Sequence, residues 1–168
     1  TMHSYVVLVR AINVGGNNIL SMAKFREWLE GFGYDNVSTY LATGNIIMKS
    51  DKSAKQIQDQ IERDLPKSFE LNDNLIKVLV LSQAELREVI DKKPKGFGEQ
   101  PKKYHSDVVF LMDISADEAI KVFSLREGVD EVWKGDGVIY SQRLSAERTK
   151  SRLSKIVGTS AYKNMTIR

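Results

Sequence analysis

The chain has 168 residues, of which 42% are hydrophobic and 28% are charged, and its formal net charge at pH 7 is +3. This composition is typical of a soluble globular protein of one or two small domains. The chain contains no cysteine, which excludes disulfides, thiolate catalysis and cysteine-ligated metal sites and favours the cytoplasm.

The first apolar run is short. Residues 5–9 are apolar, but Arg10 follows them directly, so the run is far shorter than the roughly 20 residues of a membrane-spanning helix. It is also too short for the apolar part of a secretory leader. We therefore predict a cytoplasmic protein with no membrane partner.

Positive charge is concentrated near the end of the chain. Residues 143–168, the basic tail, hold seven basic side chains and one acidic side chain, Glu147, whereas the preceding residues hold 18 basic and 21 acidic side chains. Such a tail raises the local concentration of anions, although it is also typical of a solvated surface. Its candidate ligand-binding residues are Lys150, Arg152 and Arg168.

The first half of the chain predicts the order strand, helix, strand, strand, helix, strand. Apolar residues recur at helical spacing from Met22, and Gly33 supplies a stop. A glycine-bearing connection at residues 42–45 predicts a hairpin. A capping box predicts that the second helix begins after Ser53, and we expect it to end before Pro66. The predicted strands cover residues 5–10, 37–41, 46–49 and 75–81.

Residues 83–106 form a predicted connection between two units. A capping box from Ser82 to Glu85 predicts a helix at its start. Residues 94–106 then hold two of the three prolines, two glycines and several lysines. This composition predicts a mobile loop.

The second half repeats the order of the elements. A capping box at Ser115 predicts one helix, and apolar residues from Leu153, ended by Gly158, predict another. The Asp-Gly pair within residues 134–137 predicts a hairpin. The predicted strands cover residues 107–112, 129–133, 138–140 and 163–168.

The sequence therefore predicts an α+β fold of two tandem ferredoxin-like (βαββαβ) units with antiparallel sheets. The first unit covers residues 1–82 and the second covers residues 107–168. Because the two halves match in the order of their elements and not residue by residue, duplication is an inference from topology.

The candidate site of the first unit lies between its first strand and first helix. Adjacent glycines let the backbone turn tightly and approach a ligand, and N–H groups at a helix start attract anions. The spacing is neither that of a P-loop nor that of a dinucleotide-binding loop. The candidate ligand-binding residues of this Gly-Gly loop are Arg10, Asn13, Gly15, Gly16, Asn17 and Asn18.

Structural explanations exist for the same residues. Positive φ angles alone account for many glycine pairs, and Arg10 could form a structural salt bridge. Asn13 and Asn45 have side chains that readily bond to the backbone of a turn. We expect the Gly-Gly loop and the predicted hairpin at residues 42–45 to lie at opposite ends of their strands, so Asn45 is not assigned to the site.

Neither histidine has catalytic spacing. His3 lies near the terminus, His105 precedes a predicted strand, and we identify no acidic residue at triad or metal-ligand spacing from either. No catalytic residue is assigned, and we predict no metal and no cofactor.

The predicted third strand lacks the aromatic side chains of an RNA-recognition motif. That motif stacks bases on aromatic residues of its central strands, whereas residues 46–49 read Ile-Ile-Met-Lys. This argues against an RNA-recognition motif, while binding of a nucleic-acid backbone by the basic tail stays open.

Several separated motifs resemble one bacterial family. Residues 8–16 read Leu-Val-Arg-Ala-Ile-Asn-Val-Gly-Gly, and residues 43–46 read Thr-Gly-Asn-Ile. With Met22, Leu29, Gly33 and Thr39-Tyr40, they resemble the family called domain of unknown function 1697. Gly158-Thr159 and Thr166-Ile167-Arg168 resemble a later segment of that family.

The resemblance implies a cytoplasmic bacterial protein of two ferredoxin-like units, with no assigned activity. In the family, the segment that residues 166–168 resemble continues into Asn-Trp-Asn-Thr and a final helix. The resemblance therefore implies that the second unit is truncated before a C-terminal helix.

Three functions of different class stay open. The leading hypothesis is an anion-binding module for a nucleotide, a phosphate or a nucleic-acid backbone, which uses the Gly-Gly loop and the basic tail. One alternative is a small enzyme acting on a phosphorylated or acylated substrate. The other is a protein-interaction module without a ligand, and the oligomeric state is open in each case.

Overall fold

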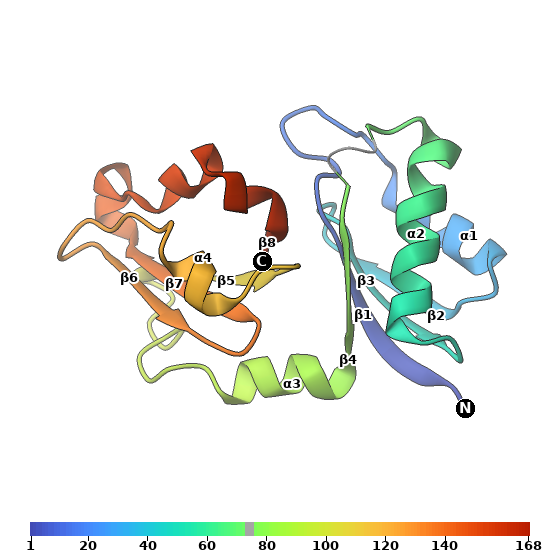
Figure 1. Ribbon diagram of the computed structural model, residues 1–168, viewed down its shortest axis with the longest axis horizontal. Helices are drawn as coiled ribbons and strands as arrows, with labels where there is room; N and C mark the ends of the chain where they lie inside the picture. The colour runs from blue at the N-terminus through green and yellow to red at the C-terminus, as the bar shows by residue number, and fades with distance from the viewer. Residues whose placement is uncertain (73–75) are drawn as a thin grey trace. The chain divides into compact units, whose positions relative to one another are not determined.

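The computed structural model describes residues 1–72 and 76–168, and the chain divides into two compact units, Thr1–Arg87 and Glu88–Arg168 (Figure 1). Each unit contains a four-stranded antiparallel sheet. The predicted α+β class is therefore confirmed. In the described part of the chain, no helix has the length and apolar character needed to cross a membrane.

The first unit has the predicted order of elements. Its sheet has the strand order β2-β3-β1-β4. A further helix, α3 (Gln83–Asp91), starts with the predicted capping box, in which Ser82 and Glu85 exchange hydrogen bonds. The elements are β1 (His3–Val9), α1 (Met22–Gly31), β2 (Asp35–Tyr40), β3 (Asn45–Ser50), α2 (Ala54–Phe69) and β4 (Val78–Ser82).

The core of the first unit follows from side-chain periodicity. Alternate residues of β1, such as Val7 and Val9, lie on one face of the sheet, and that face is covered by α1 and α2 (Figure 1). On α2, Ile57, Ile61 and Leu65 recur every four residues and are fully buried against the sheet. The apolar face of α2 therefore supplies the second layer of this core.

Two elements of the first unit have boundaries that differ from the predicted ones. The expectation that the second helix ends before Pro66 is wrong, because α2 continues to Phe69 and is capped by Glu70, whose φ is 53°. A proline in the last turn removes only one helical N–H donor. Residue Leu75 of the predicted fourth strand lies outside the described residues, and β4 begins at Val78.

The second unit has the strand order β6-β7-β5-β8. Three short 3-10 segments connect β7 to β8 (Figure 1). The elements are β5 (Tyr104–Leu111), α4 (Ala116–Ile120), β6 (Asp130–Lys134), β7 (Val138–Leu144), η1 (Ser145–Lys150), η2 (Leu153–Gly158), η3 (Ser160–Asn164) and β8 (Met165–Ile167).

Three expectations for the second unit differ from its structure. The helix predicted from Leu153 is the 3-10 segment η2, and α4 has only five residues. The expected mobile loop is too long, because residues 104–106 belong to β5. The buried ring of Phe97 anchors the remainder against Tyr140, at a centroid distance of 5.1 Å. The Gly98 N–H also donates to Oε1 of Gln142 at 3.1 Å, so this loop packs against β7 at two neighbouring residues.

The expectation that the Gly-Gly loop and the β2–β3 hairpin lie at opposite ends of their strands is wrong. Since β1 and β3 are antiparallel, the end of β1 meets the start of β3, and Leu8 is paired with Asn45. The Val9 N–H donates to the Gly44 carbonyl at 2.9 Å. The two connections are therefore neighbours.

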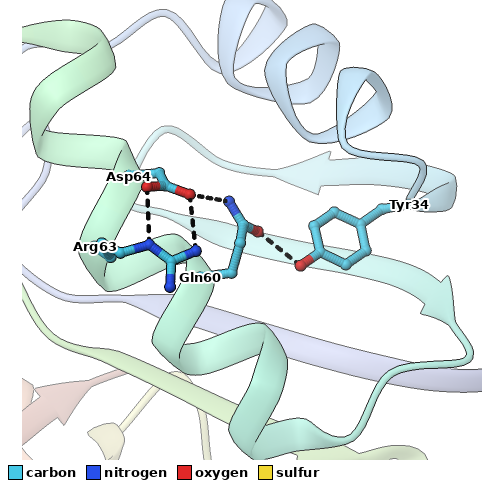
Figure 2. A network of polar contacts seen from close by, with 4 residues as sticks. All are labelled: Tyr34, Gln60, Arg63 and Asp64. Atoms are coloured by element: carbon cyan, nitrogen blue, oxygen red, sulfur yellow. Dashed lines mark hydrogen bonds and ion pairs between the residues drawn. The ribbon is translucent and has the colours of Figure 1, made fainter.

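A polar network joins α2 to the residue before β2 (Figure 2). The buried Tyr34 hydroxyl donates to Oε1 of Gln60 at 2.7 Å, and Nε2 of Gln60 donates to Asp64 at 3.3 Å. Arg63 donates to both carboxylate oxygens of Asp64. Burial, and then the charge of Asp64, raise the pKa of Tyr34 to about 12. The network thus holds a neutral phenol at the edge of the core.

We predict that the protein loses stability between pH 10 and pH 12 through Tyr34. The phenol has a pKa near 10 in the unfolded chain and about 12 in the folded chain. Above pH 10 the unfolded state therefore binds fewer protons, and the free energy of unfolding falls as pH rises, by roughly 1 kcal/mol at pH 11 from this group. Urea unfolding from pH 9 to pH 11 checks this against Tyr34→Phe, which should show a shallower fall. Parallel falls in the two proteins would contradict the prediction.

We also predict that Gly44→Ala is much more destabilising than Gly15→Ala. At Gly44, with φ at +87°, a Cβ atom would lie 2.6 Å from the Val9 carbonyl oxygen and 3.0 Å from Cδ1 of Ile12. At Gly15, with φ at +57°, a Cβ atom meets nothing within 4 Å. We expect losses of roughly 1 kcal/mol for Gly15→Ala, from φ alone, and roughly 3 kcal/mol or more for Gly44→Ala. Urea unfolding measures both, and equal losses would refute the packing role of Gly44.

Candidate functional site

The Gly-Gly pair forms the tip of a small hairpin. Gly15 and Gly16 have φ angles of 57° and 78°, and the Asn17 N–H donates to the Val14 carbonyl at 2.9 Å. These are the features of a two-residue turn with positive φ at both central positions. The helix α1 begins later, at Met22, so the pair does not lie at the helix start. The geometry of a tight turn accounts for both glycines.

The asparagines of the Gly-Gly loop bind backbone. The Asn13 amide donates to the carbonyls of Leu20 and Ala42, at 2.8 and 2.7 Å, and its oxygen accepts from the Leu20 N–H. The Asn18 amide donates to the Ala11 carbonyl, and its oxygen accepts from the Asn72 N–H. These side chains hold the loop together and attach it to the β2–β3 hairpin.

The other candidates of this loop differ in exposure. Asn17 is exposed and Arg10 is half-buried. The Arg10 N–H donates to the Lys77 carbonyl at 2.8 Å. The structure thus groups the six sequence-predicted residues in one loop, but it gives Asn13 and Asn18 structural partners.

The three candidates of the basic tail have separate partners. Lys150 pairs with Glu147 at 2.9 Å, and the Arg152 N–H donates to Asp130. Arg168 exchanges backbone hydrogen bonds with Val108. Burial lowers the pKa of Arg168 to about 10, so its guanidinium remains charged at neutral pH.

A cavity of about 200 Å³ lies in the second unit, between the sheet and η2. Its apolar lining comes from β5, β8, η2 and the segment after α4. Four polar residues complete the lining on the sheet and on η2. The apolar residues are Val109, Phe123, Leu153, Ile156, Val157 and Ile167. The polar residues are Asp107, Ser141, Arg143 and Ser154.

Strand register gathers the polar residues of the sheet. In the antiparallel pair of β5 and β7, Asp107 lies opposite Ser141, and His105 lies opposite Arg143. Since alternate residues of a strand share a face, these four side chains lie on the same face of the sheet. Val109 continues that face into the apolar core of the unit.

Asp130 holds the segment that leads into η2. Its carboxylate accepts from the Ser151 hydroxyl at 2.6 Å and from the N–H groups of Arg126 and Arg152, both at 2.8 Å. Three charge-assisted hydrogen bonds to one carboxylate are a strong anchor. They fix residues 151–152 and thereby the start of η2, which forms one wall of the cavity.

The polar end of the cavity carries opposite charges. One Asp107 oxygen lies 3.1 Å from Nε2 of His105 and 4.0 Å from the Arg143 guanidinium. Ser141 is only 5% exposed as a residue, and it lines the cavity beside Asp107 and Arg143.

His105 has an acidic neighbour that sequence spacing does not mark as a triad or metal partner. Two positions apart on a strand, His105 and Asp107 share a face, and their side chains approach to 3.1 Å. The arrangement is still not a Ser-His-Asp triad, which places the imidazole between the other two groups. Here Asp107, not His105, lies opposite Ser141.

Sequence reasoning missed most of this site. Arg143 was counted only as part of the basic tail, and Asp107, Ser141 and Asp130 were not singled out. The His-x-Asp spacing within a predicted strand was the available indication. Over residues 1–72 and 76–168, no three His, Asp or Glu side chains group closely enough to hold a metal ion.

One comparison with known proteins identifies the family, and another shows a similar fold. No curated protein matches the chain. A conserved bacterial protein from Streptococcus pneumoniae, SP0830, has a solved structure that is similar, with 24% sequence identity and a TM-score of 0.78 over 100% of this chain and 93% of that one. A family model described as "Protein of unknown function (DUF1697)" matches residues 2–140. The chain therefore belongs to the DUF1697 family.

Proposed function

We propose that the protein binds a small molecule with an anionic group, and that the cavity of the second unit is its binding site. The observation that carries this proposal is the presence, at one cavity, of the Arg143 guanidinium and the hydroxyl of Ser141. A guanidinium presents donors in a planar fork that matches carboxylate and phosphate oxygens. Ser141 offers a further donor to the same ligand.

The cavity is favoured over the Gly-Gly loop. A binding loop needs donors that are available to a ligand, whereas Asn13 and Asn18 are engaged with backbone and the glycines form a tight turn. The size of the cavity favours a small molecule over a nucleic acid. About 200 Å³ is below the roughly 300–1,000 Å³ of pockets for drug-sized ligands.

We also propose that both units are ferredoxin-like and arose by tandem duplication in a cytoplasmic, bacterial protein. The same relative strand order in the two sheets supports this, since β6-β7-β5-β8 corresponds to β2-β3-β1-β4. The second unit differs by having 3-10 segments where the first has α2. In this proposal, that replacement makes room for the cavity.

One observation favours the alternative of a small enzyme acting on a phosphorylated or acylated substrate. A carboxylate that orients an imidazole is a common arrangement in general acid–base catalysis, and Asp107 lies 3.1 Å from His105. His105 is exposed beside the cavity lining. Turnover of acetyl phosphate, lost in His105→Gln, would favour this alternative over binding alone.

We predict that 4-methylpentanoate or inorganic phosphate stabilises the protein and that Arg143→Gln removes the effect. A ligand at a hundred times its dissociation constant adds about 2.7 kcal/mol to the free energy of unfolding. Thermal unfolding at low and high salt measures this. Lys163→Gln is the matched control, because it removes one exposed positive charge from the same unit and should keep the effect. Equal stabilisation of wild type and Arg143→Gln, or none by any small molecule that carries a carboxylate or a phosphate, would refute the proposal.

A further inference from the structure

We infer that the ligand of the second-unit cavity is a small zwitterion with an apolar side chain, of the chemical class of leucine. This inference rests on the proposed function and specifies its ligand. It depends on three features of the cavity: two opposite charges, an apolar wall and a small volume.

The charges at the polar end are arranged for a ligand that carries both signs. The Arg143 guanidinium and the Asp107 carboxylate both line the cavity and lie 4.0 Å apart. That separation exceeds hydrogen-bond distance, so the two groups retain donors and acceptors for a ligand. A carboxylate on Arg143 and an ammonium on Asp107 would each form charge-assisted hydrogen bonds.

A simple anion fits this end less well. An anion bound to Arg143 lies close to Asp107, and like charges a few ångströms apart in a partly buried site repel strongly. His105, at 3.1 Å from Asp107, offsets that repulsion only when its imidazole is protonated. An ammonium on the ligand itself removes the repulsion at the place where it arises.

The rest of the cavity suits a short apolar side chain. Val109, Leu153 and Ile156 are buried side chains that line it, and Phe123 adds an aromatic surface. Burial of apolar ligand surface against such a wall is favourable. A volume of about 200 Å³ is below that of pockets for drug-sized ligands, so the ligand has few non-hydrogen atoms.

The direct test is calorimetric titration of the full chain with leucine and three related probes. L-leucine has a carboxylate, an ammonium and an apolar side chain. Each of the others lacks one of these groups: 4-methylpentanoate lacks the ammonium, 3-methylbutylamine lacks the carboxylate, and glycine lacks the side chain. We expect leucine to bind at least about 10-fold more tightly than each of the others. The two single-charge probes each lose charge-assisted hydrogen bonds, and glycine loses the burial of apolar surface.

Asp107→Asn separates the role of the carboxylate. The variant should weaken leucine binding about 10-fold or more and should not weaken binding of 4-methylpentanoate. Asp136→Asn, at the exposed tip of the β6–β7 hairpin, is the matched control and should bind leucine like wild type. The thermal midpoint of each variant shows whether it is folded, and the titrations of wild type do not depend on any variant.

The titrations distinguish failure of the zwitterion from failure of the proposed anion site. If 4-methylpentanoate binds at least as tightly as leucine, the zwitterion is refuted while anion binding stands. Unchanged leucine binding by Asp107→Asn also refutes the zwitterion. If neither probe binds and inorganic phosphate does not bind, both are refuted.

Discussion

The register between β5 and β7 determines the chemistry of the second unit. Pairing of Asp107 with Ser141 and of His105 with Arg143 places a carboxylate, a hydroxyl, an imidazole and a guanidinium on one face of one sheet. The next residues on that face, Val109 and its neighbours, belong to the apolar core. A shift of one of these strands by one residue would move its side chains to the other face, which would separate the carboxylate and imidazole of β5 from the hydroxyl and guanidinium of β7. The cavity is therefore a consequence of strand alignment.

A second constraint is the absence of a long helix over this face of the second-unit sheet, in the part of the chain that the structure describes. In the first unit, the sixteen-residue helix α2 packs Ile57, Ile61 and Leu65 onto the sheet. In the second unit the corresponding connection is made of short 3-10 segments, and Asp130 holds residues 151–152 at the start of η2. Short 3-10 segments present fewer side chains along one line than a long helix does. The polar end of the sheet face is thus left beside a recess.

Local patterns in the sequence predicted the elements well, because helix caps and strand alternation depend on near neighbours. The serine caps at Ser53, Ser82 and Ser115 are all present in the structure. The site was harder to predict, since it depends on pairing between residues 34 or more positions apart, such as Asp107 with Ser141. The Gly-Gly loop illustrates the converse, because the same motif that suggested a ligand site is also what a tight turn and its backbone hydrogen bonds require.

Mapping the bound ligand by nuclear magnetic resonance tests the central claim, which is that the second-unit cavity binds a small molecule with an anionic group. Amide shifts are followed while the protein is titrated with whichever of L-leucine and 4-methylpentanoate binds more tightly. The account predicts that the largest shifts occur at Asp107, Ser141 and residues 151–157, with Gly15 and Gly16 unchanged. Shifts concentrated at Gly15 and Gly16, with the cavity residues unchanged, would contradict it.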